Sequence, residues 1–172
     1  MDEAAVRIAT ICECIDHCFS FAVWCDDFAR HVGPEDMMMG LAPGHALVSD
    51  ATRLLSFLAI RKIDDFLRGT RSKPDDLIAA DLGIDSGAIL STVGGRFITQ
   101  EERTNINKGA AHLTQQLTLD ADSEVELTAI ISRSLPLFRC LAAQLRAQDE
   151  ADDAKFWLDR TDMLIARVAS SS

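Results

Sequence analysis

Positive charge is scarce in this sequence. Its 172 residues include 17 lysines and arginines against 27 aspartates and glutamates, which gives a formal net charge of -10. Excess negative charge favours solubility and opposes non-specific binding to nucleic-acid phosphates or anionic lipids. Nucleic acid is therefore not the default partner. One local basic run departs from this balance, and it consists of Arg61, Lys62, Arg68, Arg71 and Lys73.

Long uninterrupted hydrophobic runs are also missing. The most apolar stretches, residues 18–25 and 54–60, are bounded by charged side chains and fall short of the roughly 20 residues that cross a bilayer as a helix. The chain begins Met1-Asp2-Glu3, whereas a secretory signal begins with basic residues. These absences predict a cytoplasmic protein without a membrane span.

The cysteines are odd in number, and four of the five lie between residues 12 and 25. Thiols along one helix do not generally reach disulfide geometry, so we expect reduced cysteines. Cys14, His17 and Cys18 share a helix face, but that face is apolar, and cysteine packs there as a small hydrophobic residue. The usual zinc, di-iron, phosphate-loop, nucleophile-elbow and dinucleotide motifs are absent from the sequence. We therefore predict no metal and no cofactor.

What the sequence does contain is helical periodicity. Hydrophobic residues make up 48% of the chain, enough for a core without disulfides, and they recur mostly three or four positions apart. This pattern predicts one all-α domain over residues 1–172, a helical bundle of about five main helices. We expect main helices at residues 2–31, 43–68, 99–113, 123–148 and 151–169, and a short helix at 74–82. A connector with several glycines, residues 83–98, either pairs as a short hairpin or lies across the bundle.

Local signals set the expected helix ends. Gly33-Pro34 ends the first helix, Pro43 suits the first turn of the second, and Gly69 ends it. Pro136 should kink the helix 123–148 near residues 132–135. Met37-Met38-Met39-Gly40 reads as a loop that fills a gap in the core, with a ligand-contacting methionine cluster as the alternative.

A polar stripe follows one face of the predicted helix 99–113, at spacings of four, three and four residues. Its members are Glu101, Asn105, Lys108 and His112. The last turn of a helix stabilises a cation, which would let His112 act as a general acid or base, with Lys108 or Arg103 holding an anionic group. The alternative is a solvated helix face with a capping histidine or a polar contact between helices.

The end of this stripe, Asn107-Lys108-x-x-x-His112, resembles the motif of the HEPN superfamily. Members of that superfamily are helical bundles that often act as metal-independent ribonucleases in paired subunits. The resemblance implies His112 as a catalytic residue and Asn107 as a polar neighbour. In this sequence Asn107 stands where the superfamily has an arginine. A non-catalytic member would fit the same residues.

The second predicted helix carries four charged side chains at salt-bridge spacing, namely Arg61, Asp64, Asp65 and Arg68. Surface ion pairs explain them without any function. If Asp64 instead faced His112 across the bundle, its carboxylate would orient the imidazole, as in many acid/base sites.

Because no catalytic motif is complete, the sequence favours a non-enzymatic interaction or regulatory domain with a protein partner. Helices this long expose more than one apolar stripe, which also predicts a homodimer. The alternative function is a HEPN-like ribonuclease acting through His112, and RNA is a partner only under that alternative. In such a site Asn105 and Asn107 would orient a phosphate and Lys108 would stabilise negative charge. Capture of RNA would require the basic run to lie beside His112.

Overall fold

The fold consists of helices and their connections. A computed structural model describes residues 2–31, 43–71, 73–115 and 127–171, and these contain seven α-helices, one 3-10 helix and no strand. The all-α prediction is therefore confirmed. The predictions for the Met37–Met39 loop and for the start of a helix near residue 123 lie outside the described residues.

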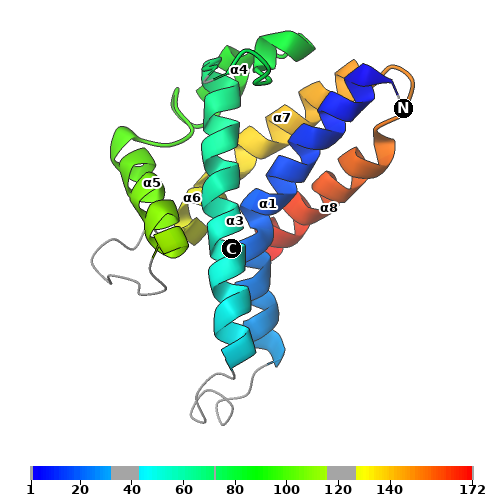
Figure 1. Cartoon of the computed structure of the whole chain (residues 1–172). Helices are drawn as coiled ribbons and strands as arrows, with labels where there is room; N and C mark the ends of the chain where they lie inside the picture. Colours follow the sequence, from blue (N-terminus) through cyan, green and yellow to red (C-terminus); the bar gives the residue numbers. More distant parts are fainter. Residues whose placement is uncertain (1, 32–42, 72, 116–126, 172) are drawn as a thin grey trace.

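The two longest helices cross each other. α1 (Glu3–His31) and α3 (Pro43–Arg68) have the predicted extents, and Figure 1 shows α3 passing in front of α1. Ser56 is fully buried at the crossing. Its hydroxyl donates to the His17 carbonyl at 3.0 Å and accepts from the Phe21 N–H at 3.2 Å. Because the serine side chain is small, the two helix backbones approach closely at Ser56. Its two hydrogen bonds fix where the helices cross.

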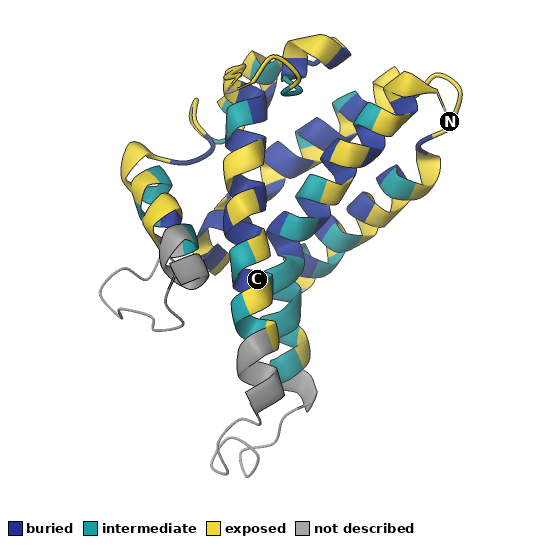
Figure 2. Cartoon of the chain, viewed as in Figure 1, coloured by how far each residue is buried: buried dark blue, intermediate teal, exposed yellow. Residues whose placement is uncertain are grey.

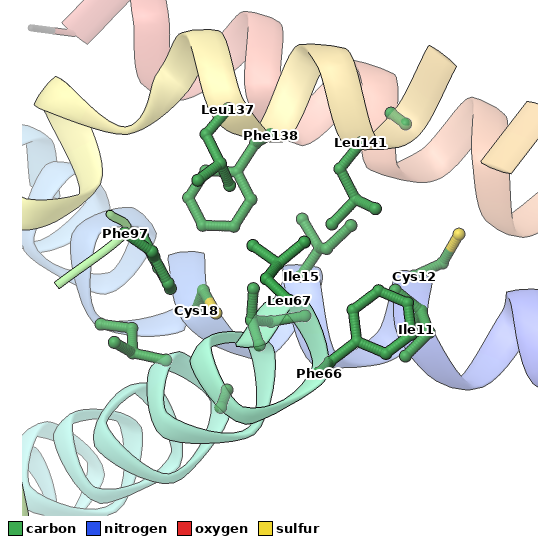
Figure 3. Close-up of a cluster of buried hydrophobic side chains, with 14 of the residues drawn as sticks. Ile11, Cys12, Ile15, Cys18, Phe66, Leu67, Phe97, Leu137, Phe138 and Leu141 are labelled. Atoms are coloured by element: carbon green, nitrogen blue, oxygen red, sulfur yellow. The ribbon is translucent and has the colours of Figure 1, made fainter. Parts of the chain in front are cut away.

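The core forms where α1 meets the C-terminal helices. α1 packs against α8 (Lys155–Ser171), which in turn packs against α7 (Leu135–Gln148), and Figure 1 shows the three running side by side. The ring centroid of Phe138 lies 4.9 Å from that of Phe19 and 5.6 Å from that of Phe97, and both ring pairs are packed edge to face. Figure 3 shows Phe138 among aliphatic side chains of α1 and α3, and Figure 2 shows that the buried faces of the helices turn inward.

α1 corrects one expectation from the sequence. Its segment Glu3–Phe28 is long and apolar enough to cross a membrane by length and composition, and an 18-residue window within it has a mean hydropathy of 1.4. That window holds at most two charged side chains, too few to lower the average below the criterion for a span. A core helix of a soluble protein and a signal sequence meet the same criterion. In the structure, Ile8, Ile15 and Phe19 on this helix are fully buried against the rest of the chain.

The prediction of a short helix at residues 74–82 is wrong for the first half of that segment. Only η1, a 3-10 helix at Ala79–Leu82, forms there. The Arg71 guanidinium donates hydrogen bonds to the backbone carbonyls of Pro74 (3.3 Å) and Asp76 (2.7 Å). In a helix these carbonyls would accept from backbone N–H groups of the same helix. The Asp76 carboxylate accepts from the Lys73 N–H at 2.7 Å, so the residues that looked like a helix start form a turn instead.

The connector 83–98 lies across the bundle, which decides between the two predicted arrangements. It contains one short helix, α4 (Ser86–Ser91), which packs against α7 and α3. Asp85 caps α4 by accepting from the Ala88 N–H at 3.0 Å. Gly94 and Gly95 then adopt φ values of 80° and 93°, a left-handed turn that glycine makes without strain.

Pro136 divides the helix that we predicted as kinked. α6 (Leu127–Arg133) ends before Ser134, and α7 begins at Leu135 with the proline in its first turn. Proline lacks the N–H that a continuous helix needs, but an N-terminal turn does not use that donor. The last helix, α8, starts at Lys155, later than predicted. The Asp149 carboxylate explains the delay, because it accepts from the Ala154 N–H at 3.0 Å and 3.1 Å.

Candidate binding site

The predicted polar helix is present as α5 (Gln100–Gln115), and its start is a capping box. The Glu102 N–H donates to the Thr99 hydroxyl at 3.1 Å, and the Thr99 N–H donates to the Glu102 carboxylate at 2.8 Å. In the described part of the polar stripe, Lys108 is exposed and Asn105 is half-buried. These side chains lie mainly on the solvent side of α5, since Ile106 occupies the buried side.

His112 belongs to α5, but its side chain lies outside the described residues. Asn107 is exposed and does not share the stripe of Asn105 and Lys108. The convergence of these groups on a nuclease site therefore stays a prediction.

Asp64 is buried, with 1% of its residue surface exposed, so it is not part of a surface ion pair as the sequence suggested. Arg68 Nε donates to its carboxylate at 3.0 Å, and Arg103 on α5 donates to it as well. Arg103 also reaches Asp65 at 2.5 Å. One guanidinium thus spans two neighbouring carboxylates and joins α5 to α3. We call Asp64, Asp65, Arg68 and Arg103 the α3–α5 clamp.

Arg103 is the residue whose role sequence reasoning missed. We expected it to hold an anionic ligand, and the anions that it holds are carboxylates of the same chain. The hydrogen bonds that the Arg103 guanidinium donates, first to Asp65 and then to Asp64, raise its pKa. Its consecutive acidic partners, Asp64-Asp65, were visible in the sequence, but a separation of 39 residues hid the contact.

The basic run divides between separate environments. Arg68 belongs to the clamp and also donates to the Ile98 carbonyl at 3.3 Å. Arg71 binds Asp81 at 2.5 Å. The other three cations, Arg61, Lys62 and Lys73, lie around one hollow between α1, the C-terminal half of α3 and the segment 70–77. The run therefore does not form one continuous basic surface.

This hollow, which we call the α1–α3 groove, has a volume of about 370 Å³. It lies beside the end of α3 that is nearest α4 in Figure 1. Apolar side chains from both helices and from the segment 70–77 form its floor, and charged and hydroxyl side chains surround them. The apolar members are Ile11, Cys14, Leu58, Ile63, Phe66 and Leu77, and the polar members are Thr10, Arg61, Lys62, Asp65, Thr70, Lys73 and Asp76.

Cys14 is the only nucleophilic thiol among the residues that line the groove. Burial raises its pKa above the usual range, although nearby Lys62 acts in the opposite direction. The thiol is therefore protonated at neutral pH and is a poor nucleophile. Within the described residues, no group of three or more His, Cys, Asp or Glu side chains is placed to hold a metal ion.

Comparison with known proteins identifies no relative, since no family model, curated protein or solved structure matches the chain. The function must therefore be argued from the groove itself.

Proposed function

We propose that this protein is a helical interaction domain that binds a ligand or partner carrying an apolar group and a negative charge in the α1–α3 groove. The observation that carries this proposal is the position of Arg61, Lys62 and Lys73 around an apolar floor. Small-molecule sites combine apolar lining with a few polar groups that fix orientation, and their volumes start at about 300 Å³. The groove satisfies both conditions.

The charge of the whole chain supports the same proposal. A protein with a formal charge of -10 repels anions over most of its surface, so three cations around one hollow create a local exception. Among the described residues, the salt bridge of Arg61 is a long one, 3.8 Å from its Nε to Asp65. Lys62 and Lys73 are exposed at the rim. These cations attract an anionic group, and the floor beneath them favours an apolar one.

A fluorescent anion with an apolar body tests this proposal directly. Anilinonaphthalene sulfonate (ANS) should bind with one dye per chain and become fluorescent. Lys62→Glu should weaken that binding by about tenfold, because it replaces attraction by repulsion at the rim. The matched control is Lys155→Glu, since Lys155 is an exposed lysine of α8 that does not line the groove.

Circular dichroism should show that both variants keep the helical spectrum. Loss of affinity in the Lys62 variant alone supports the groove. Absence of saturable dye binding, or equal affinities in the two variants, would reject it.

The homodimer and the HEPN-like nuclease remain separate proposals. Exposed apolar side chains at Phe156 and Met163 of α8 are compatible with a dimer contact. For the nuclease, the nearest arginine upstream of His112 in the sequence is Arg103, whose guanidinium is bound in the α3–α5 clamp. The binding groups proposed for the α1–α3 groove all lie among the described residues, whereas the His112 side chain on which the nuclease depends does not.

A further inference from the structure

We propose that the natural occupant of the α1–α3 groove is a single-chain amphiphile with one negative charge, an alkyl carboxylate of about ten carbons. This inference rests on the proposed function and narrows it to one chemical class. Three features of the groove support it, namely its size, the chemistry of its floor and its charge balance.

The size of the groove favours a small molecule. Its volume of about 370 Å³ lies near the lower end of the roughly 300–1,000 Å³ of small-molecule sites. A ligand as small as a ten-carbon carboxylate suits a site at that end of the range. A partner helix would instead need several anchoring side chains along an extended groove, and stable protein interfaces bury about 800 Å² on each partner. The α1–α3 groove is too small to bind such a partner.

The floor favours an alkyl chain over a flat ring. Ile11 and Ile63 are buried beneath the hollow and Leu58 forms part of its exposed wall. Phe66 is the single aromatic side chain among the lining residues. Branched aliphatic surfaces contact a flexible chain along its length, and each buried methylene contributes about 0.8 kcal/mol to transfer from water.

The charge balance favours a single negative charge on the ligand. Three cations and two carboxylates, Asp65 and Asp76, line the groove, which leaves one net positive charge. Both carboxylates are held in place by hydrogen bonds within the chain, so their negative charges stay at the groove. Asp65 binds Arg103 at 2.5 Å, and Asp76 accepts from the Lys73 N–H at 2.7 Å. A monoanionic head group would neutralise the remaining charge, whereas a dianionic phosphate would also meet the two carboxylates.

Displacement of ANS by a matched series of ten-carbon amphiphiles tests the inference. The series comprises decanoate, decanol, decyl phosphate and decyltrimethylammonium. The three ionic members are kept below their micelle concentrations and decanol below its solubility limit. Decanoate should displace the dye with one molecule per chain. At about pH 8, where decyl phosphate is a dianion, each of the other three should bind at least about tenfold more weakly, because none of them is a monoanion.

Two leucines of α3 provide a matched pair that locates the alkyl chain. Leu58 and Leu55 are equally exposed, at 42% and 41%, but only Leu58 lines the groove. Leu58→Ser should weaken decanoate binding by about tenfold, while Leu55→Ser should leave it unchanged. Lys62→Gln supplies a second readout that does not alter the floor, and it should weaken decanoate more than decanol.

The outcomes separate the two proposals. If ANS binds in a Lys62-dependent manner but decanoate does not displace it, the alkyl carboxylate is rejected and the proposed function stands. Decyl phosphate or decanol binding as tightly as decanoate, or equal effects of the two leucine variants, also overturns the inference. If ANS itself fails to bind, both proposals fall together.

Discussion

Replacing Arg103 by alanine should lower the free energy of unfolding by about 3 kcal/mol, because it leaves the buried Asp64 carboxylate with only one of its two cationic partners. Removal of one partner from a buried ion pair costs far more than removal of an exposed one. The expected loss is measured by urea unfolding, followed by circular dichroism.

Arg133→Ala is the matched control for this loss. Arg133 also joins two helices through a carboxylate, binding Glu102 at 2.6 Å and 2.7 Å, but its side chain is 45% exposed. Exposed pairs contribute about 1 kcal/mol or less. Arg103→Lys should fall between the two, since an ammonium keeps the charge but cannot span two carboxylates as a guanidinium does. Equal losses for Arg103→Ala and Arg133→Ala would contradict the role of the clamp.

The second large effect is a loss of stability in alkaline solution that originates at Cys12. This thiol is fully buried, and burial raises its pKa from 9.0 to about 11. Above pH 9 the unfolded chain therefore releases this proton while the folded chain keeps it. The folded state then binds more protons, so stability falls as pH rises, by up to about 2.7 kcal/mol once the pH passes the folded value.

Urea unfolding in reducing buffer at about pH 7.5 and about pH 10.5 measures this effect, which should amount to about 2 kcal/mol over that interval for Cys12 alone. Cys12→Ala removes the titrating group, so its stability should decline less over the same interval by that amount. The comparison uses the change with pH in each protein, so any constant cost of the substitution cancels. Parallel pH profiles for the parent and the variant would show that Cys12 is not the source.

The long helices could be predicted from the sequence because their signals are local. Hydrophobic spacing together with Pro43 and Gly69 located α3, and Thr99 with Glu102 located the start of α5. The segment 74–78 could not be predicted in this way. There Arg71 competes for backbone carbonyls through its side chain, a contact that residue propensities do not reveal.

The candidate site was hidden for a different reason. The sequence showed the basic run, but the spacing of its five cations gave no indication of which ones share a hollow. Arg68 and Arg71 form ion pairs with acidic residues of the chain. The other three cations of the run lie together above an apolar floor because α1 packs against α3. The polar stripe ending at His112 was the more conspicuous pattern, yet Lys108 in its described part is a solvated side chain.

The most direct test of ligand binding in the α1–α3 groove uses Cys14, which lines it. In a Cys25→Ala, Cys140→Ala background, Cys14 is the one half-buried thiol, because Cys12 and Cys18 are buried. Its alkylation by iodoacetamide, followed by mass spectrometry at mildly alkaline pH, should slow about tenfold when ANS is present at ten times its dissociation constant. At the same dye concentration, the Lys62→Glu protein should be slowed only about twofold, because a tenfold weaker site is then about half occupied. An unchanged alkylation rate of Cys14 under saturating ANS would contradict binding in this groove.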